Sequence, residues 1–113
     1  HTIGHAIEAA ARYNYYNHGE AVALGMRVAS NISNQMGMFS RGNLLLLNGL
    51  LSDIGLPERI KKVSMRDIMR IMKHDKSFIL GRNRFVLVQQ IGKVKVVEGV
   101  SINLITKAVK EYM

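Results

Sequence analysis

The chain has 113 residues, no cysteine and 48% hydrophobic residues, and its 16 Lys and Arg against 8 Asp and Glu give a formal net charge of +8. This length fits one domain, residues 1–113, with a modest core, and the absence of cysteine excludes a disulfide scaffold and a thiolate metal site. No apolar run approaches the ~20 residues that a membrane span needs, and no signal peptide is visible, so we expect a cytoplasmic protein without a membrane partner.

The first predicted helix runs from Thr2 to Ala11. Counted from His1, which directly precedes this helix, His1, His5 and Glu8 follow the i, i+4, i+7 spacing of one helix face. Ile3 and Ile7 repeat the same spacing on another face, which can pack in the core. One side of this helix is therefore expected to be buried while the other presents imidazoles.

A second helix is predicted to open at His18-Gly19 and to run from Glu20 to about Gln35. The short segment 12–17 breaks the helical pattern between the two, and a loop of this length would bring His18 back towards the first helix. Gly25 lies among the apolar positions of the second helix and would allow another helix to approach closely. We expect Met26 and Met36 to belong to the core.

Three of the four histidines thus lie in the first 18 residues. A single histidine on a half-apolar helix is most often a polar residue without a special role. Three together, beside Gly4 and Gly19, favour a site, because two imidazoles at i, i+4 can bind a metal or one can bind metal while the other moves a proton. Imidazole and carboxylate ligands without thiolate favour zinc or a similar divalent ion.

The remaining elements are mostly helical. Ser40 is expected to cap a helix from Gly42 to about Asp53, whose many leucines predict a central position in the bundle or contact with a partner domain. Ser64 is expected to cap a fourth helix that ends near residues 74–76. Two short strands are predicted at 85–88 and 94–97, and Ser101 is expected to cap a last helix that reaches about Glu111. The fold class is mainly α, a helical bundle with one small β-hairpin.

Basic residues gather between residues 59 and 84. Such a field would attract a substrate that carries phosphate and carboxylate, but it would also suit nucleic acid or an ordinary solvated surface. The few aromatic residues do not alternate with the basic ones, which disfavours a base-stacking platform and hence a basic helical nucleic-acid-binding module. A purely structural interaction domain is a further alternative.

The sequence His-Thr-Ile-Gly-His-Ala-Ile-Glu at 1–8, followed by His-Gly-Glu-Ala-Val-Ala-Leu-Gly-Met at 18–26, resembles the paired signature of the 3-dehydroquinate synthase family of the shikimate pathway. The similarity continues through Gly-Leu-Pro at 55–57, Asp-Lys at 75–76, Arg-Phe-Val-Leu at 84–87 and Ile-Gly at 91–92. The resemblance is less decisive among sugar-phosphate cyclases that share the fold, such as 2-deoxy-scyllo-inosose or valiolone synthases.

The resemblance implies roles for individual residues. His1 and His18 match the two zinc-binding histidines of the motifs, where Co²⁺ is an alternative metal. His5 matches the histidine placed near the phosphate and hydroxyl groups of the substrate, with an acid/base role. The family's Asp-Lys-Lys motif contacts substrate through a lysine; here it reads Asp-Lys-Ser, so the contact is assigned to Lys76.

The resemblance also implies what lies outside this chain. Family members carry an N-terminal Rossmann-like domain that binds NAD and supplies a glutamate as the third zinc ligand, and they are expected to be homodimers. No Gly-rich phosphate-binding fingerprint occurs here, so the chain reads as a C-terminal domain. The implied reaction converts 3-deoxy-D-arabino-heptulosonate 7-phosphate to 3-dehydroquinate with loss of phosphate, and the isolated chain is expected to be inactive.

Overall fold

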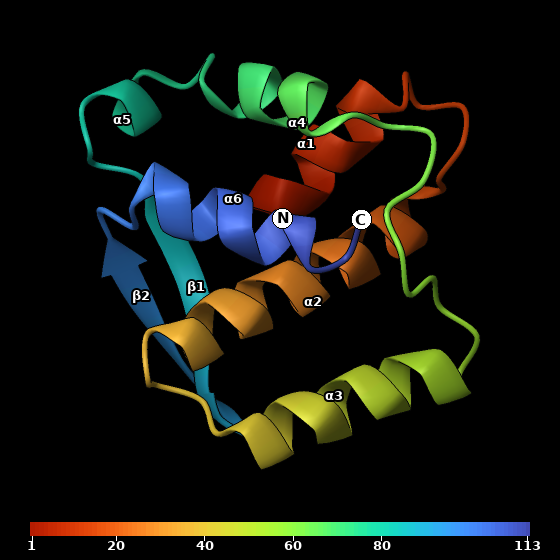
Figure 1. Ribbon diagram of the computed structural model, residues 1–113, viewed down its shortest axis with the longest axis vertical. Coiled ribbons are helices and arrows are strands. Elements are labelled where there is room, and N and C mark those ends of the chain that lie inside the picture. The colour runs from red at the N-terminus through yellow and green to blue at the C-terminus, as the bar shows by residue number, and fades with distance from the viewer.

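The computed structural model describes residues 1–113 as helices packed around one another, with a single two-stranded hairpin along one side (Figure 1). The elements in chain order are α1 (Thr2–Ala10), α2 (His18–Gln35), α3 (Arg41–Asp53), α4 (Met65–Met72), α5 (Lys76–Ile79), β1 (Arg84–Gln90), β2 (Lys93–Glu98) and α6 (Ile102–Lys110). The expected fold class, mainly α with one hairpin, is confirmed. None of the helices combines the length and the apolarity that spanning a membrane requires.

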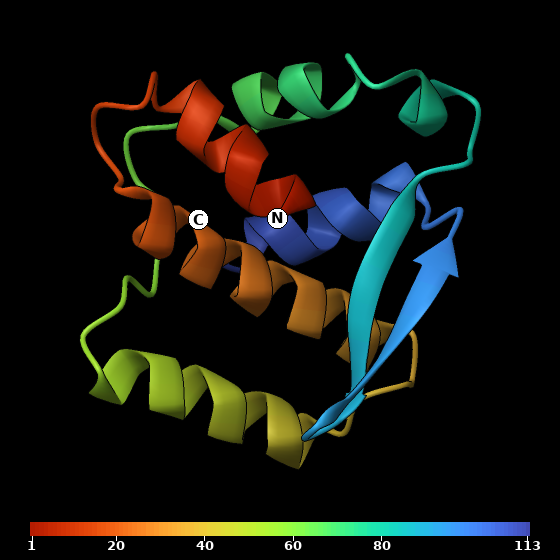
Figure 2. The same ribbon diagram turned by 180° about the vertical axis from the view of Figure 1, so that it is seen from behind.

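Helix α2 is the centre of the fold. It contacts α1, α3, α6 and strand β1, while α4 lies over α1 and reaches α6 (Figures 1 and 2). Its apolar positions Leu24, Val28 and Ile32 are fully buried. They recur every four residues, so they form one stripe towards α1 and α6.

Two glycines allow α1 and α2 to meet backbone to backbone. A Cβ added at Gly25 would lie 2.8 Å from the backbone nitrogen of Gly4, and one added at Gly4 would lie 3.0 Å from the carbonyl oxygen of Ala21. No side chain fits at that separation, which confirms the close approach expected at Gly25. The register of α1 on α2 is therefore fixed at this crossing.

The hairpin covers one end of α2. Strand β1 pairs antiparallel with β2 from Arg84 opposite Glu98 to Val88 opposite Val94, with a bulge between Val88 and Gln90. Phe85 and Leu87 point into the core, and the Ser33 hydroxyl of α2 donates to the carbonyl of Val88. The other face of the strands carries exposed valines.

Several sequence-based expectations about individual helices were wrong. The short helix α5 was not anticipated. Helix α3 is not central in the bundle, because Leu45, Leu46 and Leu50 are more than half exposed while Leu44 and Leu51 are buried. The alternative expectation, contact with a partner domain, stays a prediction. Met26 and Met36 are 43% and 40% exposed rather than core residues. For α2 and α3 the apolar pattern predicted the helix correctly but did not reveal how many neighbours would cover it.

Candidate metal and substrate site

The three histidines of the N-terminal motifs meet at one place on the surface. The ring centroids of His1 and His5 are 5.4 Å apart, those of His1 and His18 are 6.0 Å apart, and those of His5 and His18 are 5.9 Å apart. All three side chains are exposed. The crossing of α1 over α2 therefore gathers imidazoles from two helices into one open cluster.

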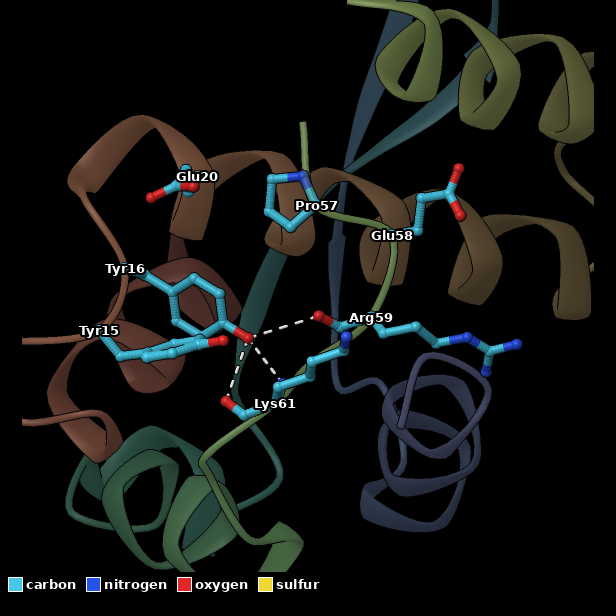
Figure 3. A pocket seen from close by; sticks show the side chains of 7 residues that line it. All are labelled: Tyr15, Tyr16, Glu20, Pro57, Glu58, Arg59 and Lys61. Atoms are coloured by element: carbon cyan, nitrogen blue, oxygen red, sulfur yellow. Dashed lines mark hydrogen bonds between the residues drawn. The ribbon is translucent and has the colours of Figure 1, made fainter. Parts of the chain in front are cut away.

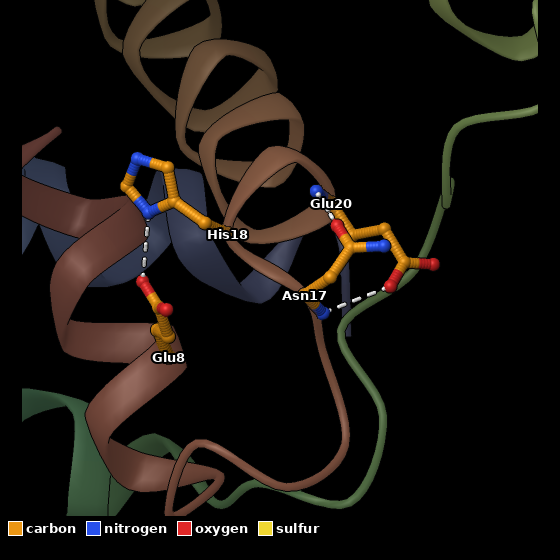
Figure 4. Close-up of polar contacts among 4 residues, drawn as sticks. All are labelled: Glu8, Asn17, His18 and Glu20. Carbon is orange, nitrogen blue, oxygen red and sulfur yellow. Dashed lines mark hydrogen bonds and ion pairs between the residues drawn. The ribbon is translucent and has the colours of Figure 1, made fainter.

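The start of α2 is fixed by a capping box. The Asn17 side chain accepts a hydrogen bond from the backbone N–H of Glu20 at 2.8 Å, and the Glu20 carboxylate accepts from the backbone N–H of Asn17 at 3.0 Å (Figure 4). Both interactions satisfy N–H groups that have no partner within the helix. They place His18 at the first position of α2, beside α1.

The connecting loop is held from the other side by a buried tyrosine. The Tyr16 hydroxyl accepts a hydrogen bond from the backbone N–H of Lys61 at 2.6 Å and donates to the carbonyl oxygen of Lys61 at 3.1 Å (Figure 3). Burial raises the pKa of Tyr16, so the hydroxyl stays protonated. The adjoining cavity of about 530 Å³ is lined by residues of this loop, by Glu20 of α2 and by segment 57–61, and none of the three clustered histidines lines it.

The loop also contains two residues in the left-handed backbone region. Arg12 has φ 55° and Tyr13 has φ 56°. This conformation is disfavoured for residues with a Cβ, and it is retained only where the surrounding structure imposes it. Here it turns the chain sharply after α1, so that the five residues between Ala11 and Asn17 can return to α2.

Glu8 joins the cluster through His18. Its Oε2 lies 3.1 Å from Nδ1 of His18, and the second ring nitrogen of His18 points away from the carboxylate (Figure 4). The sequence placed Glu8 on the same helix face as His1 and His5 but gave it no role. Its i+7 spacing from His1 was the available signal.

The donor set fits a divalent metal such as zinc. Two imidazoles on one tetrahedral zinc ion have ring centroids roughly 5 Å apart, given Zn–N bonds of about 2.0 Å. The separation of His1 and His18, 6.0 Å, is close to that value and can be closed by rotating exposed side chains. As they stand, no three His, Asp or Glu side chains form a group that could hold an ion. The two histidines alone are thus an incomplete ligand set.

Two shallow cavities flank the histidine cluster. His5 lines one of about 380 Å³ together with Tyr13 of the loop and Asp75, which precedes α5. His1 lines another of about 290 Å³ together with Thr2 and Arg84, the first residue of β1. Arg84 has no carboxylate within ion-pair distance, and the sequence had not marked it as a site residue.

Lys76 lies at the first position of α5 and is exposed. Its neighbour Asp75 caps α5 by accepting from the backbone N–H of Ser77 at 2.9 Å. Asp75 lines the same cavity as His5, whereas the exposed side chain of Lys76 does not line it. The fold therefore brings Asp75, but not the side chain of Lys76, to the cavity that His5 lines.

The family model and the sequence relatives that match this chain all carry the name 3-dehydroquinate synthase. The family model described as 3-dehydroquinate synthase C-terminal matches residues 1–78. The chain is 39% identical over 101 residues to a 3-dehydroquinate synthase of Desulforamulus reducens, covering 88% of this chain and 28% of that protein. It is 37% identical over 111 residues to the enzyme of the same name from Nostoc punctiforme, covering 97% of this chain and 31% of that protein.

The solved structures that match this chain are sugar-phosphate cyclases, the superfamily to which 3-dehydroquinate synthases also belong. The whole chain superposes on 34% of a 2-deoxy-scyllo-inosose synthase complexed with carbaglucose-6-phosphate, NAD⁺ and Co²⁺, with a TM-score of 0.87 and 30% sequence identity. A second structure of a 2-deoxy-scyllo-inosose synthase matches with a TM-score of 0.85 and 29% identity. The chain spans about a third of these proteins and somewhat less of the curated relatives.

Proposed function

Since the chain belongs to the 3-dehydroquinate synthase C-terminal family, we propose that it forms the metal-binding and part of the substrate-binding half of such an enzyme. The whole protein would convert 3-deoxy-D-arabino-heptulosonate 7-phosphate to 3-dehydroquinate with release of phosphate. The observation that carries this proposal is the convergence of His1, His5 and His18 on one open surface.

His1 and His18 would hold the divalent ion, zinc or cobalt. They come from the two helices that cross at Gly4 and Gly25, so the crossing sets the distance between them. A bound divalent ion would hold the substrate's hydroxyls and lower the pKa of the hydroxyl that gives up hydride. A third ligand, a glutamate from another domain, would complete the set, which is consistent with the incomplete cluster of this chain.

His5 and Lys76 would contact the substrate. His5 lies within the cluster yet also lines the cavity bordered by Asp75, so its imidazole can face both the ion and a substrate seated between α1 and α5. It would move a proton between solvent and a substrate oxygen. Lys76 would pair with a phosphate or carboxylate group as a flexible point charge.

NAD would be bound by an N-terminal Rossmann-like domain outside this chain, and the complete protein would be a homodimer. The cofactor would supply the hydride chemistry. This chain would contribute the ligands, the proton-moving imidazole and one wall of the cleft. The isolated chain is therefore proposed to be inactive.

A 2-deoxy-scyllo-inosose synthase activity is the second candidate. Two solved structures of that enzyme cover the entire chain with TM-scores of 0.87 and 0.85. The sequence relatives at up to 39% identity favour 3-dehydroquinate synthase instead. The two activities differ in the sugar phosphate consumed, so substrate choice separates them.

A chimaera tests the proposal. The matching C-terminal part of the Desulforamulus reducens enzyme is replaced by this chain, and phosphate release is measured with the heptulosonate phosphate and with glucose 6-phosphate. We expect turnover of the first substrate only, and loss of turnover in the His18→Ala chimaera. A folded chimaera that turns over glucose 6-phosphate alone supports the second candidate, and a folded chimaera without activity on either overturns the proposal.

A further inference from the structure

Resting on the proposed metal site, we propose that Glu8 is a positioning residue that orients the His18 imidazole and fixes which of its nitrogens faces the ion. Glu8 belongs to α1 and His18 to α2, and the contact between Oε2 and Nδ1 at 3.1 Å joins the two helices at the histidine cluster (Figure 4). The ion itself would touch His18 and not Glu8.

The chemistry of the contact determines the tautomer. An ionised carboxylate can only accept hydrogen bonds, so Nδ1 of a neutral His18 must carry the hydrogen that is donated to Glu8. Nε2 then has the lone pair, and it is this nitrogen that points away from Glu8. A metal-binding histidine whose other ring nitrogen donates to a carboxylate has a fixed ring orientation and a more basic ligand nitrogen.

The environment makes this contact different from an ordinary surface ion pair. The Glu8 side chain is only 16% exposed, whereas that of His18 is 59% exposed. The Glu8 side chain is thus largely covered by the protein, while the His18 imidazole extends into solvent. No other carboxylate of the chain lies within ion-pair distance of a histidine, so Glu8 singles out His18 among the three clustered rings.

The ring tautomer of His18 provides a readout that needs no metal. Long-range proton–nitrogen NMR spectra of the 113-residue chain distinguish a hydrogen on Nδ1 from one on Nε2. We expect Nδ1–H in the unchanged chain and a shift towards Nε2–H in Glu8→Ala. Glu8→Gln should keep much of the Nδ1–H form, because the amide oxygen still accepts.

Metal affinity provides the second readout. Titration calorimetry with zinc should show a tenfold or greater loss of affinity in Glu8→Ala and a smaller loss in Glu8→Gln. Glu20→Gln is the matched control, because it removes the same charge two residues from His18 yet retains an amide that can form the capping box. It should change neither the tautomer nor the affinity, and dispersed amide spectra show that each variant is folded.

The outcomes separate this inference from the function on which it rests. Zinc binding by the unchanged chain that is insensitive to Glu8, or a His18 tautomer that is the same in Glu8→Ala, overturns the positioning role. Abolition of zinc binding in Glu8→Ala with an unchanged tautomer also overturns it, because Glu8 would then be a ligand. If no variant binds zinc, as the incomplete ligand set of this chain allows, the tautomer alone decides the positioning role, and the chimaera with its His18→Ala variant decides the metal site.

Discussion

Helix α2 meets α1 and α3 in two different ways. Towards α1 the backbones touch at Gly4 and Gly25, and the neighbouring side chains Ile3, Ile7 and Leu24 are almost completely buried. Towards α3 the helices are farther apart and are tied by polar contacts, while much of the leucine surface of α3 remains exposed. The histidine cluster lies beside this close contact, so the backbone crossing of α1 and α2 also sets how near its three rings lie to one another.

The polar tie to α3 is a single buried arginine. Arg27 is 2% exposed, and its guanidinium donates to the carbonyl oxygens of Pro57 at 2.9 Å and Asn48 at 3.1 Å and to the Ser52 hydroxyl at 3.1 Å. No carboxylate lies within ion-pair distance of it. The charge is therefore compensated by oriented neutral oxygens rather than by a counter-ion.

The largest expected effect is on the helix crossing. Gly25→Ala places a Cβ 2.8 Å from the backbone of Gly4, so the helices must separate, and we expect the free energy of unfolding to fall by about 3 kcal/mol. Gly49→Ala is the matched control on α3, where nothing lies within 4 Å of the added Cβ. It should raise stability by up to about 1 kcal/mol through helix propensity. Urea unfolding measures both, and equal effects would refute the contrast between the two interfaces.

Removing the polar tie should have the next largest effect. Arg27→Met removes the donor to the half-buried Pro57 carbonyl and to the Ser52 hydroxyl, while the Asn48 carbonyl still accepts from Ser52, and we expect a loss of about 2 kcal/mol of unfolding free energy. Arg27→Lys should recover only part of this loss, because an ammonium cannot reproduce the planar fork. Protection of the α3 amides from hydrogen exchange should fall more than that of the α1 amides. A uniform loss across the chain would contradict a local tie.

Relieving the strained loop should stabilise the α1–α2 side. Arg12→Gly should raise the unfolding free energy by about 1 kcal/mol, since glycine adopts φ 55° without steric cost. Arg12→Ala removes the same side chain but keeps the Cβ, so it should give no gain. Thermal unfolding of the pair measures the difference, and an equal gain in both would show that the side chain, not the backbone, is responsible.

The smallest effect is expected on the open face of α3. Leu50→Ala should change the unfolding free energy by less than about 0.5 kcal/mol, because the side chain is already 56% exposed. Its neighbour Leu51, at 5% exposure, is the control and should cost about 2 kcal/mol or more when changed to alanine. Denaturant unfolding compares the two. A large loss from Leu50→Ala would mean that this face is covered in solution.

The grouping of the three histidines in the candidate site could be predicted from the sequence. The i, i+4, i+7 spacing of residues 1, 5 and 8 was sufficient to place them on one helix face, and the short loop predicted the return of His18. The contact between Glu8 and His18 was not predicted, because it depends on the rotation of α1 about its own axis relative to α2. The cavity that joins His5 to Asp75 depends on where α4 and α5 lie, and α5 itself was missed: four residues are too few to show a helical period.

The sequence by itself determined the helices other than α5, the hairpin, the serine caps and the family, because these depend on local spacing and on motifs read along the chain. Only the tertiary structure decided which apolar residues are covered and which polar groups meet. Leu50 and Leu51 are identical side chains next to each other, and their burial differs because α3 has a neighbour on one face only. Burial is a property of the assembled elements, so a local pattern can predict that a face is apolar but not what lies against it.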